Sequence, residues 1–250
     1  MLKLNWTIIF LLLLIMSSLA QSNPAYEIVK KSDNLIHGRS SYGDLEMTVK
    51  NPYFERTLKM KVWNESRKKV FIRILYPAKE AGIGTLKIGS EMWNYLPAIE
   101  KVIKIPPSMM MVPWMGSDFS NEDIVRDSSI VEDYDHRIMT EEVVEGSRLY
   151  KIEALPKPAA PVVWGKIYFW VRKSDDVPIR KEYYDEKGKL VKLLEYKDVK
   201  PMGGRIVPTF MVMRSLLKEK SMTALRIIKC QYDLAIPNNI FSLRNLQTTK

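Results

Sequence analysis

Residues 45–63 read LEMTVKNPYFERTLKMKVW, and the period of this stretch decides how most of the chain folds. Apolar residues occupy every second position on either side of the turn residues Asn51 and Pro52. A period of two places alternate side chains on opposite faces of a β-strand. The stretch therefore predicts a half-buried β-hairpin. Its apolar face consists of Leu45, Met47, Val49, Leu58, Met60 and Val62.

The same kind of pattern extends over most of the chain. Turn residues separate several strand-like runs, notably at 185–188 (DEKG) and 202–204 (MGG). Because the connections are short, about ten or eleven strands in sequence favour an antiparallel meander. Residues 23–38 differ, since apolar residues at helical spacing between Pro24 and Gly38 predict an amphipathic helix. The predicted fold class is α+β, mostly β. Its further strand-like runs are KVFIRILY, GTLKIG, EMWNYL, KVIKI, RLYKIEAL, VVWGKIYFWVRK, PIRKEYYD, KLVKLLEYKDV, RIVPTFMVMR and TALRIIKCQYD.

One predicted strand, VVWGKIYFWVRK at 162–173, is apolar on both faces. Ile167 and Phe169 share one parity, and Tyr168 and Trp170 share the other. A sheet with one wet face alternates more cleanly. We therefore expect packed helices, a bound apolar ligand or a partner to cover both sides of the sheet here.

Between the two groups of strands, residues 105–123 read IPPSMMMVPWMGSDFSNED. The prolines prevent a regular helix, and Ser120 to Asp123 can cap a short helix that runs toward Arg126. Residues 106–133 therefore form a predicted loop-and-helix insertion across the meander, too apolar for disorder. Methionine conforms to irregular apolar shapes. The insertion could line an acyl-chain pocket, plug the core between helix and sheet, or form an exposed docking patch. Its large apolar residues are Met109, Met110, Met111, Trp114, Met115 and Phe119.

The first 20 residues have the composition of a secretory signal peptide. One lysine precedes an apolar run, and Ser18 and Ala20 stand at the spacing of a signal peptidase site. We expect cleavage after Ala20 and a single domain over residues 21–250. Cys230 is the only cysteine, so the chain can form no intramolecular disulfide, and we expect it to pack in a strand as a small hydrophobe. Export without disulfides fits a bacterial periplasm. The full sequence has a net charge of +10, and removal of Lys3 with the signal leaves +9, which favours an anionic membrane surface or an acidic partner over nucleic acid.

The sequence carries no local signature of a serine hydrolase or a zinc metalloprotease site. It has two histidines and neither a GxSxG nor an HExxH motif. The acidic run at 132–136 lacks the glycine and the distal glutamate of a calcium loop, so we interpret it as a solvated turn. We therefore expect no enzymatic activity, no metal and no cofactor.

Several segments resemble the LolA-like outer-membrane lipoprotein-sorting proteins, in particular the longer branch of the LolA/LolB superfamily. The central one is GSEMWNYLPAIEKVIKIPPSMMMVPWMGSDFSNEDIV at 89–125. It is accompanied by RILYPAKEAGIGTL at 73–86, the segment from 161 to 192, and IPNNIFSLRNL at 236–246. The resemblance implies a curved antiparallel half-barrel, with helices and loops covering a concave face around an apolar cavity. In the classical carriers this cavity takes the acyl chains of lipoproteins that cross the periplasm. Arg56 and Arg73 are both candidates for the cavity arginine of those carriers, and neither is assigned.

The resulting hypothesis is a periplasmic, chaperone-like carrier that binds lipoprotein acyl chains or other lipids for transfer toward the outer membrane. An inner-membrane transporter of the resistance-nodulation-division (RND) type or the ABC type is an expected partner, with transient membrane contact. The alternative is an interaction module of an RND-type exporter without lipid cargo. Trp93 and Tyr95 share one face of a predicted strand and either pack in the core or line the cavity. The candidate lipid-binding residues are Trp93, Tyr95, Met109, Met110, Met111, Trp114, Met115 and Phe119.

Overall fold

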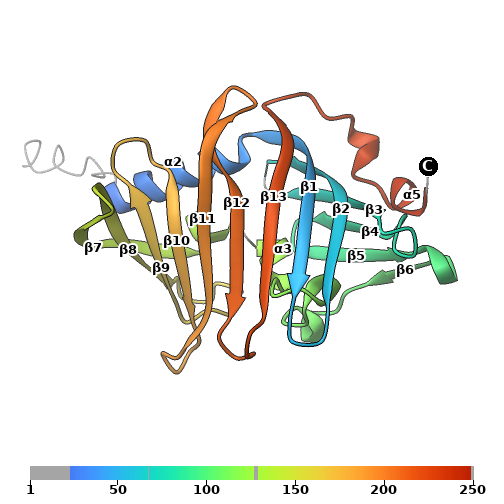
Figure 1. Ribbon diagram of the computed structural model, residues 1–250, viewed down its shortest axis with the longest axis horizontal. Coiled ribbons are helices and arrows are strands. Elements are labelled where there is room, and N and C mark those ends of the chain that lie inside the picture. Colours follow the sequence, from blue (N-terminus) through green and yellow to red (C-terminus); the bar gives the residue numbers. More distant parts are fainter. Residues whose placement is uncertain (1–22, 67, 127–128, 249–250) are drawn as a thin grey trace, which may run out of the picture.

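The computed structural model describes residues 23–66, 68–126 and 129–248. The predicted signal peptide lies outside these residues. The described chain forms one antiparallel sheet of thirteen strands with a few short helices, and the sheet is open rather than closed (Figure 1). The strands are β1 (Ser40–Lys50), β2 (Glu55–Glu65), β3 (Lys69–Tyr76), β4 (Gly84–Ile88), β5 (Glu91–Leu96), β6 (Lys101–Lys104), β7 (Tyr134–Val144), β8 (Ser147–Pro156), β9 (Lys166–Arg172), β10 (Pro178–Tyr184), β11 (Leu190–Met202), β12 (Arg205–Ser215) and β13 (Met222–Tyr232). The α-helices are α2 (Pro24–His37), α3 (Asn121–Arg126), α4 (Ser129–Glu132) and α5 (Leu243–Gln247), and the 3-10 helices are η1 (Pro97–Ile99), η2 (Pro107–Met109), η3 (Trp114–Gly116) and η4 (Asn238–Ile240).

Two meanders join in the middle of the sheet, where β1, the first strand of the chain, pairs with β13, the last. The strand order is β6-β5-β4-β3-β2-β1-β13-β12-β11-β10-β9-β8-β7. The edges are therefore β6 and β7, which are consecutive in the chain. The segment that links them, residues 105–133, has to pass from one edge of the sheet to the other. We call it the crossing segment. The predicted antiparallel meander is confirmed, with thirteen strands instead of ten or eleven.

The hairpin predicted from residues 45–63 is confirmed as β1 and β2, and Leu45 pairs with Met60 across it. The predicted N-terminal helix is confirmed as α2. The Asn23 side chain accepts a hydrogen bond from the Ala25 backbone N–H at 3.0 Å, and Gly38 ends the helix with φ of 63°. A glycine adopts this positive φ without steric cost. Among the described residues, no helix has the length and apolar character needed to span a membrane.

Strand β7 was not predicted, and the solvated turn expected at 132–136 is wrong. Glu132 ends α4, and the strand begins two residues later with the buried Tyr134. Most of the other β7 residues are half-buried or exposed, because the strand lies at an edge of the sheet. An edge strand of this kind shows little apolar alternation. The acidic residues before and within it therefore resembled a loop.

Two groups of buried residues fill the concave face. One lies between α2, α4 and strands β8–β12, and it includes Val29, Val131 and Phe169. The other lies between the crossing segment and strands β1–β3, and it includes Leu58, Ile72 and Trp114. The two halves of the sheet thus have different covers. Helix α2, with α4 at the end of the crossing segment, covers one half, and the earlier part of the crossing segment covers the other.

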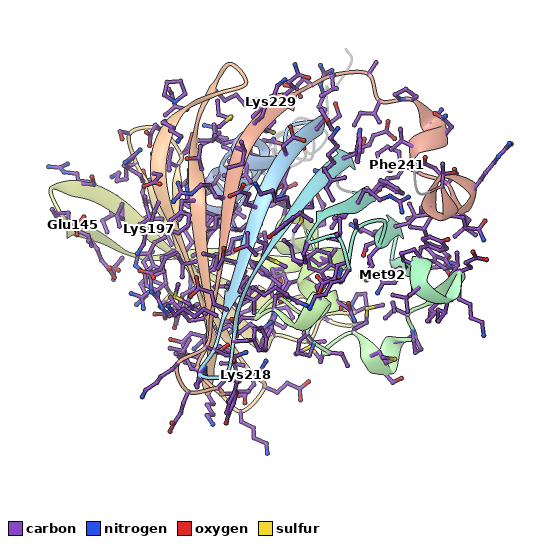
Figure 2. The ribbon with its side chains drawn as sticks, turned by 45° about the vertical axis from the view of Figure 1, so that its right-hand side comes forward. Met92, Glu145, Lys197, Lys218, Lys229 and Phe241 are labelled. Atoms are coloured by element: carbon purple, nitrogen blue, oxygen red, sulfur yellow. The ribbon has the colours of Figure 1, made fainter. Side chains whose placement is uncertain are left out.

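The convex face has its own apolar cover over β3–β6. The chain leaves β13 at the upper end of the sheet and descends to α5 beside these strands (Figure 1). Phe241 and Leu246 of this C-terminal segment pack with Phe71, Leu86 and Tyr95. Figure 2 shows Phe241 close to α5, and it places Lys229 and Lys218 toward opposite ends of β13. Strands β3–β5 can therefore carry apolar residues on both faces.

Long cationic side chains cover the outer face of β9. The Lys166 ammonium lies 4.7 Å from the ring centre of Tyr168, and the Arg180 guanidinium lies 5.1 Å from that of Trp170. Lys151 lies over both rings, at 4.8 and 5.0 Å. Lysine and arginine stems cover apolar surface while their charged ends attract aromatic faces. Side chains of the neighbouring strands therefore supply a cover on this face, which the sequence analysis did not anticipate.

Candidate functional site: an apolar pocket under the crossing segment

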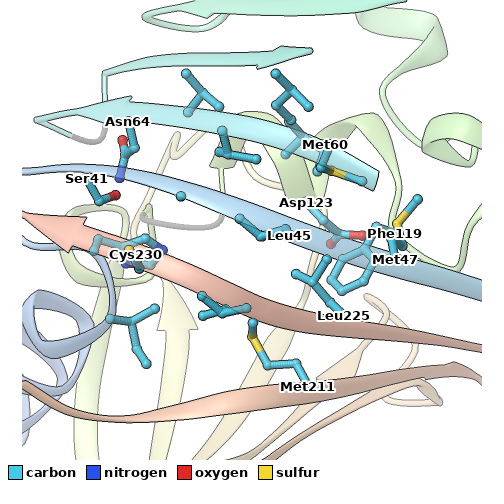
Figure 3. Close-up of a pocket in the computed structure, with 18 of the residues that line it drawn as sticks. Ser41, Leu45, Met47, Met60, Asn64, Phe119, Asp123, Met211, Leu225 and Cys230 are labelled. Carbon is cyan, nitrogen blue, oxygen red and sulfur yellow. The ribbon is translucent and has the colours of Figure 1, made fainter. Parts of the chain in front are cut away.

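A pocket with a volume of about 230 Å³ lies on the concave face, where the covers of the two halves meet. Strands β13, β1, β2 and β3 form its floor, and Trp114, Phe119 and Ile124 reach it from the crossing segment (Figure 3). A dry apolar cavity of ~150 Å³ in another protein admits benzene. The pocket is thus large enough for part of a hydrocarbon chain.

The register of the sheet arranges the pocket floor in layers. Leu45 pairs with Ile227 on one side and with Met60 on the other, and Met47 pairs with Leu225. All of these residues line the pocket. Layers across adjacent strands, about 5 Å apart, form a continuous apolar floor.

The floor becomes polar toward the start of β1. Ser41 pairs with Asn64 on β2 and with Tyr232 on β13, and all three residues line the pocket. His37, from the last turn of α2, also lines it. Figure 3 shows Ser41 and Asn64 at one end and Phe119, Met47 and Met211 at the other. We call the first the polar end and the second the apolar end.

Gly43 lies between the two ends, at a point where the sheet leaves no room for a side chain. A Cβ atom built on it would lie 2.7 Å from the Lys229 backbone oxygen. Opposite it, β13 has an irregular register between the partners of Asp44 and Leu45. This irregularity brings the neighbouring backbone close to Gly43, so a side chain there would clash.

Hydrogen bonds hold the crossing segment on the sheet. The Trp114 indole N–H donates to Thr85 Oγ1 on β4 at 3.1 Å. The buried Asp118 carboxylate accepts hydrogen bonds from the hydroxyls of Ser221 at 2.9 Å and Thr223 at 2.8 Å. Buried polar groups cost free energy unless they are paired, so these contacts fix the position of the segment.

A buried ion pair adds a further anchor. The Lys192 ammonium of β11 lies 2.5 Å from Asp123 Oδ2, and both side chains are only 8% exposed. The same oxygen accepts the backbone N–H of Ser120 at 2.6 Å and its hydroxyl at 2.8 Å. Asp123 also lines the pocket, so this pair links the strand of one meander to the cover of the other.

The two candidate arginines differ in what they hold. Arg56 of β2 donates to Glu80 Oε1 at 2.7 Å and to the backbone oxygen of Met115 in the crossing segment. Arg73 donates to backbone oxygens of Gly82, Asn245 and Leu246, at 2.6 to 3.0 Å. Arg56 therefore ties down the cover of the pocket, and Arg73 ties down the C-terminal segment on the convex face.

The structure separates the eight predicted lipid-binding residues. Trp114 and Phe119 line the pocket. Met110 and Met115 pack against the core beneath the crossing segment. Met109 and Met111 are 43% and 47% exposed. Trp93 and Tyr95 share a face, as predicted, but they pack with the C-terminal segment on the convex side.

The sequence analysis did not identify most of the residues that line the pocket, although several of them follow the alternation of the predicted strands. Ser41 and Gly43 continue the parity of Leu45 and Met47. Asn64 continues the parity of Met60 and Val62 in the same way. The side of the pocket formed by β13 depends on the pairing of the first strand with the last, which no local pattern contains.

Burial changes the acidity of two groups at the polar end. Burial raises the pKa of the Cys230 thiol, and it also raises the pKa of the Tyr232 phenol. Both groups are therefore neutral at pH 7. In the described part of the chain, no three His, Cys, Asp or Glu side chains gather where they could hold a metal ion. The pocket is a largely apolar space with polar groups at one end, and the charged residues Lys87 and Asp123 also line it.

Comparisons with solved structures identify the fold. A member of the DUF1329 family from Desulfovibrio piger is 27% identical, with a TM-score of 0.80, and the match covers 89% of this chain and 97% of that one. A LolA superfamily protein from Nitrosomonas europaea is 22% identical, with a TM-score of 0.76 and coverage of 88% and 98%. A domain described as an outer membrane lipoprotein-sorting protein, from Vibrio parahaemolyticus, is 23% identical, with a TM-score of 0.77 and coverage of 90% and 98%. The fold is that of the LolA-like proteins.

A family model with the description "uncharacterized protein" matches residues 66–248, which is well over half of the chain. The chain belongs to that family, and the LolA-like fold predicted from the sequence is confirmed. A comparison with curated proteins found no match.

Proposed function

We propose that this protein is a non-enzymatic carrier that binds the acyl chain of a lipid or lipoprotein in the pocket on its concave face. The observation that carries the proposal is the continuous apolar floor of β13, β1, β2 and β3 beneath the crossing segment. Burial of each methylene contributes roughly 0.8 kcal/mol, so a few methylenes suffice for measurable affinity. The fold shared with LolA-like structures supports this assignment.

The carrier works in the periplasm and delivers its cargo toward the outer membrane. The export signal predicted at residues 1–20 supports this location, and the net charge of +9 that remains after its removal suits transient contact with anionic membrane surfaces. Transfer needs no cofactor, because a difference in affinity between donor and acceptor drives it. An inner-membrane transporter of the RND or ABC type is the proposed donor.

Neighbouring isoleucines of β13 provide a matched test. Ile227 lines the pocket, and Ile228 is 50% exposed on the surface. We expect Ile227→Gln to weaken binding of a fluorescent fatty-acyl probe by about tenfold, because a polar amide then replaces apolar lining. Ile228→Gln should bind as the wild type does.

Thermal unfolding with and without the probe provides the second measurement. A ligand that binds only the folded state must raise the unfolding temperature, and it should do so for the wild type and for Ile228→Gln. Equal binding by the two variants would contradict the assignment of this pocket. An absence of binding to all three proteins would contradict the carrier function itself.

A further inference from the structure

Two hairpin turns at one end of the sheet expose large apolar residues. Tyr53 and Phe54, in the β1–β2 turn, are 93% and 46% exposed. Leu216 and Leu217, in the β12–β13 turn, are 50% and 60% exposed. Single exposed apolar residues are common on protein surfaces, whereas a group of them marks a site that contacts a protein or a membrane. We call residues 51–54 and 216–221 the hairpin tips.

The strand register makes the two hairpin tips neighbours. Lys50, at the end of β1, pairs with Met222, at the start of β13. One tip follows Lys50 and the other precedes Met222, so both lie at the same end of the sheet. Figure 1 shows both turns along the lower edge of the molecule, and Figure 2 places Lys218 at this end.

Hydrogen bonds fix the shape of both tips. The Asn51 side-chain oxygen accepts the backbone N–H groups of Tyr53 at 2.8 Å and Phe54 at 3.1 Å. The Leu216 N–H donates to the Val191 backbone oxygen of β11 at 2.8 Å. The apolar side chains are thus presented by turns that are already formed, so binding through them costs less conformational entropy than the ordering of a free loop.

Lysines accompany these apolar residues. The β10–β11 turn lies beside the second tip, because Lys192 of β11 pairs with Ser215 of β12. The exposed charged residues of these two turns are Lys187, Lys189, Lys218 and Lys220 against Glu186 and Glu219. An anionic phospholipid bilayer matches this composition, since leucine and aromatic side chains enter its headgroup region and lysines beside them are attracted to lipid phosphates. Turns that project from the end of a sheet can enter a fluid bilayer directly, whereas a protein partner would need a complementary groove.

The hairpin tips also lie next to the apolar end of the pocket. Met47 and Leu225, one layer of the pocket floor, are each three residues from the end of the strand that leads into a tip. Ser221 of one tip donates a hydrogen bond to Asp118 Oδ1 of the crossing segment at 2.9 Å. Contact at the tips therefore brings a membrane close to the apolar floor and to one of the hydrogen bonds that fix its cover.

We propose that the hairpin tips dock the protein on an anionic phospholipid bilayer, with Tyr53 and Leu217 in the headgroup region and Lys218 and Lys220 beside the phosphates. The inference deepens the proposed function and rests on it, because it assigns the surface through which the carrier meets the membranes that donate or receive its lipid. The docked orientation directs the apolar end of the pocket toward the bilayer.

Sedimentation with vesicles tests the apolar part of this surface. The wild type should bind vesicles of phosphatidylcholine and phosphatidylglycerol in equal parts about tenfold more tightly than vesicles of phosphatidylcholine alone. Leu217→Asn should weaken binding to the anionic vesicles by about tenfold, because the leucine no longer enters the bilayer. Val143→Asn is the matched control, since Val143 is 71% exposed beside the β7–β8 turn, and Figure 2 shows Glu145 of that turn far from Lys218.

Two double variants with the same net charge test the lysines. Lys218→Gln/Lys220→Gln should weaken binding to the anionic vesicles by about tenfold and reduce its dependence on salt. Lys200→Gln/Lys229→Gln removes the same charge from exposed positions toward the other end of the sheet, and it should change binding by less than about twofold.

The fluorescent acyl probe separates docking from the carrier function. Every variant should bind the probe as the wild type does, because none of the substituted residues lines the pocket. Unchanged vesicle binding by Leu217→Asn and by Lys218→Gln/Lys220→Gln overturns the docking surface and leaves the carrier function intact. A wild type that binds the probe but no anionic vesicle has the same meaning, and it would assign the tips to a protein partner.

A wild type that does not bind the probe overturns the carrier function and the docking proposal with it. If Leu217→Asn fails to fold, Tyr53→Ser alters the other tip at a residue that is 93% exposed, and the same criteria apply to it.

Discussion

The ion pair between Asp123 and Lys192 should be a main determinant of stability for the cover of the pocket. Its two side chains are 8% exposed, and their charged atoms lie 2.5 Å apart. Replacing Lys192 with Met leaves a buried carboxylate without its cation, and replacing Asp123 with Leu leaves a buried ammonium. Removing one partner of a buried pair costs about 3–5 kcal/mol of unfolding free energy, whereas an exposed pair contributes only about 0.2–1 kcal/mol.

The double variant Asp123→Leu/Lys192→Met should be far more stable than the sum of the two single losses predicts. No charge then remains buried, and replacing a buried ion pair with apolar residues is often neutral. Asp123 Oδ2 also accepts the Ser120 N–H, so the double variant should still lose about 1 kcal/mol. The coupling between the two sites should therefore exceed about 2 kcal/mol.

Urea denaturation of the four proteins at pH 7 measures this coupling directly. Lipid uptake by the double variant then reports whether an apolar contact holds the crossing segment as well as the ion pair does. The reasoning would be refuted if each single variant lost less than about 1 kcal/mol of unfolding free energy. It would also be refuted if the loss in the double variant equalled the sum of the two single losses. Either result would place the pair in a solvated environment rather than under the cover.

Three further predictions concern the floor, the pH response and the mobility of the cover. Gly43→Ala should lower the unfolding free energy by about 1–3 kcal/mol, because the new Cβ would lie 2.7 Å from the Lys229 backbone oxygen. Unchanged stability in urea would contradict this close approach. Burial lowers the pKa of His136, so the folded state keeps the ring neutral while the unfolded state takes up a proton below about pH 6.5. The unfolding free energy of the wild type should therefore fall as the pH drops from about 6.5 toward the folded pKa. The His136→Gln variant should lose less unfolding free energy between about pH 7 and pH 5. Equal pH dependence of the two proteins would exclude a role for this ring. Arg56→Met should speed amide hydrogen exchange around Met115 and the release of bound lipid, because it removes the hydrogen bond from Arg56 to the Met115 backbone oxygen. Unchanged rates would show that this hydrogen bond does not limit the opening of the crossing segment.

The sequence predicted those parts of the fold that depend on neighbours in the chain. Period-two alternation located the β1–β2 hairpin, and the turn residues at 185–188 and 203–204 lie between consecutive strands. Helix α2 was predicted because its cap residues and its apolar spacing are local. Strand β7 was missed because an edge strand buries few residues, and the cover on the outer face of β9 was not anticipated because it consists of lysine and arginine stems over aromatic rings.

The site depends on contacts between residues that are distant in the sequence. Asp123 is 69 residues from Lys192, and Asp118 is 105 residues from Thr223. No periodicity contains such pairs. The sequence predicted that an apolar insertion crosses the sheet, and it identified Trp114 and Phe119. It could not show that Met109 and Met111 would be exposed, or that Trp93 and Tyr95 would lie on the convex side.

The most direct test of the central claim is lipid analysis of the wild-type protein, purified from its native compartment without detergent. Mass spectrometry of an organic extract should find acyl lipids at close to one molecule per chain, and native spectra should show the corresponding bound mass. Ile227→Gln, purified in the same way, should lose most of this lipid, and Ile228→Gln should retain it. A wild-type protein that carries no lipid, and that takes up none from vesicles, would contradict the account.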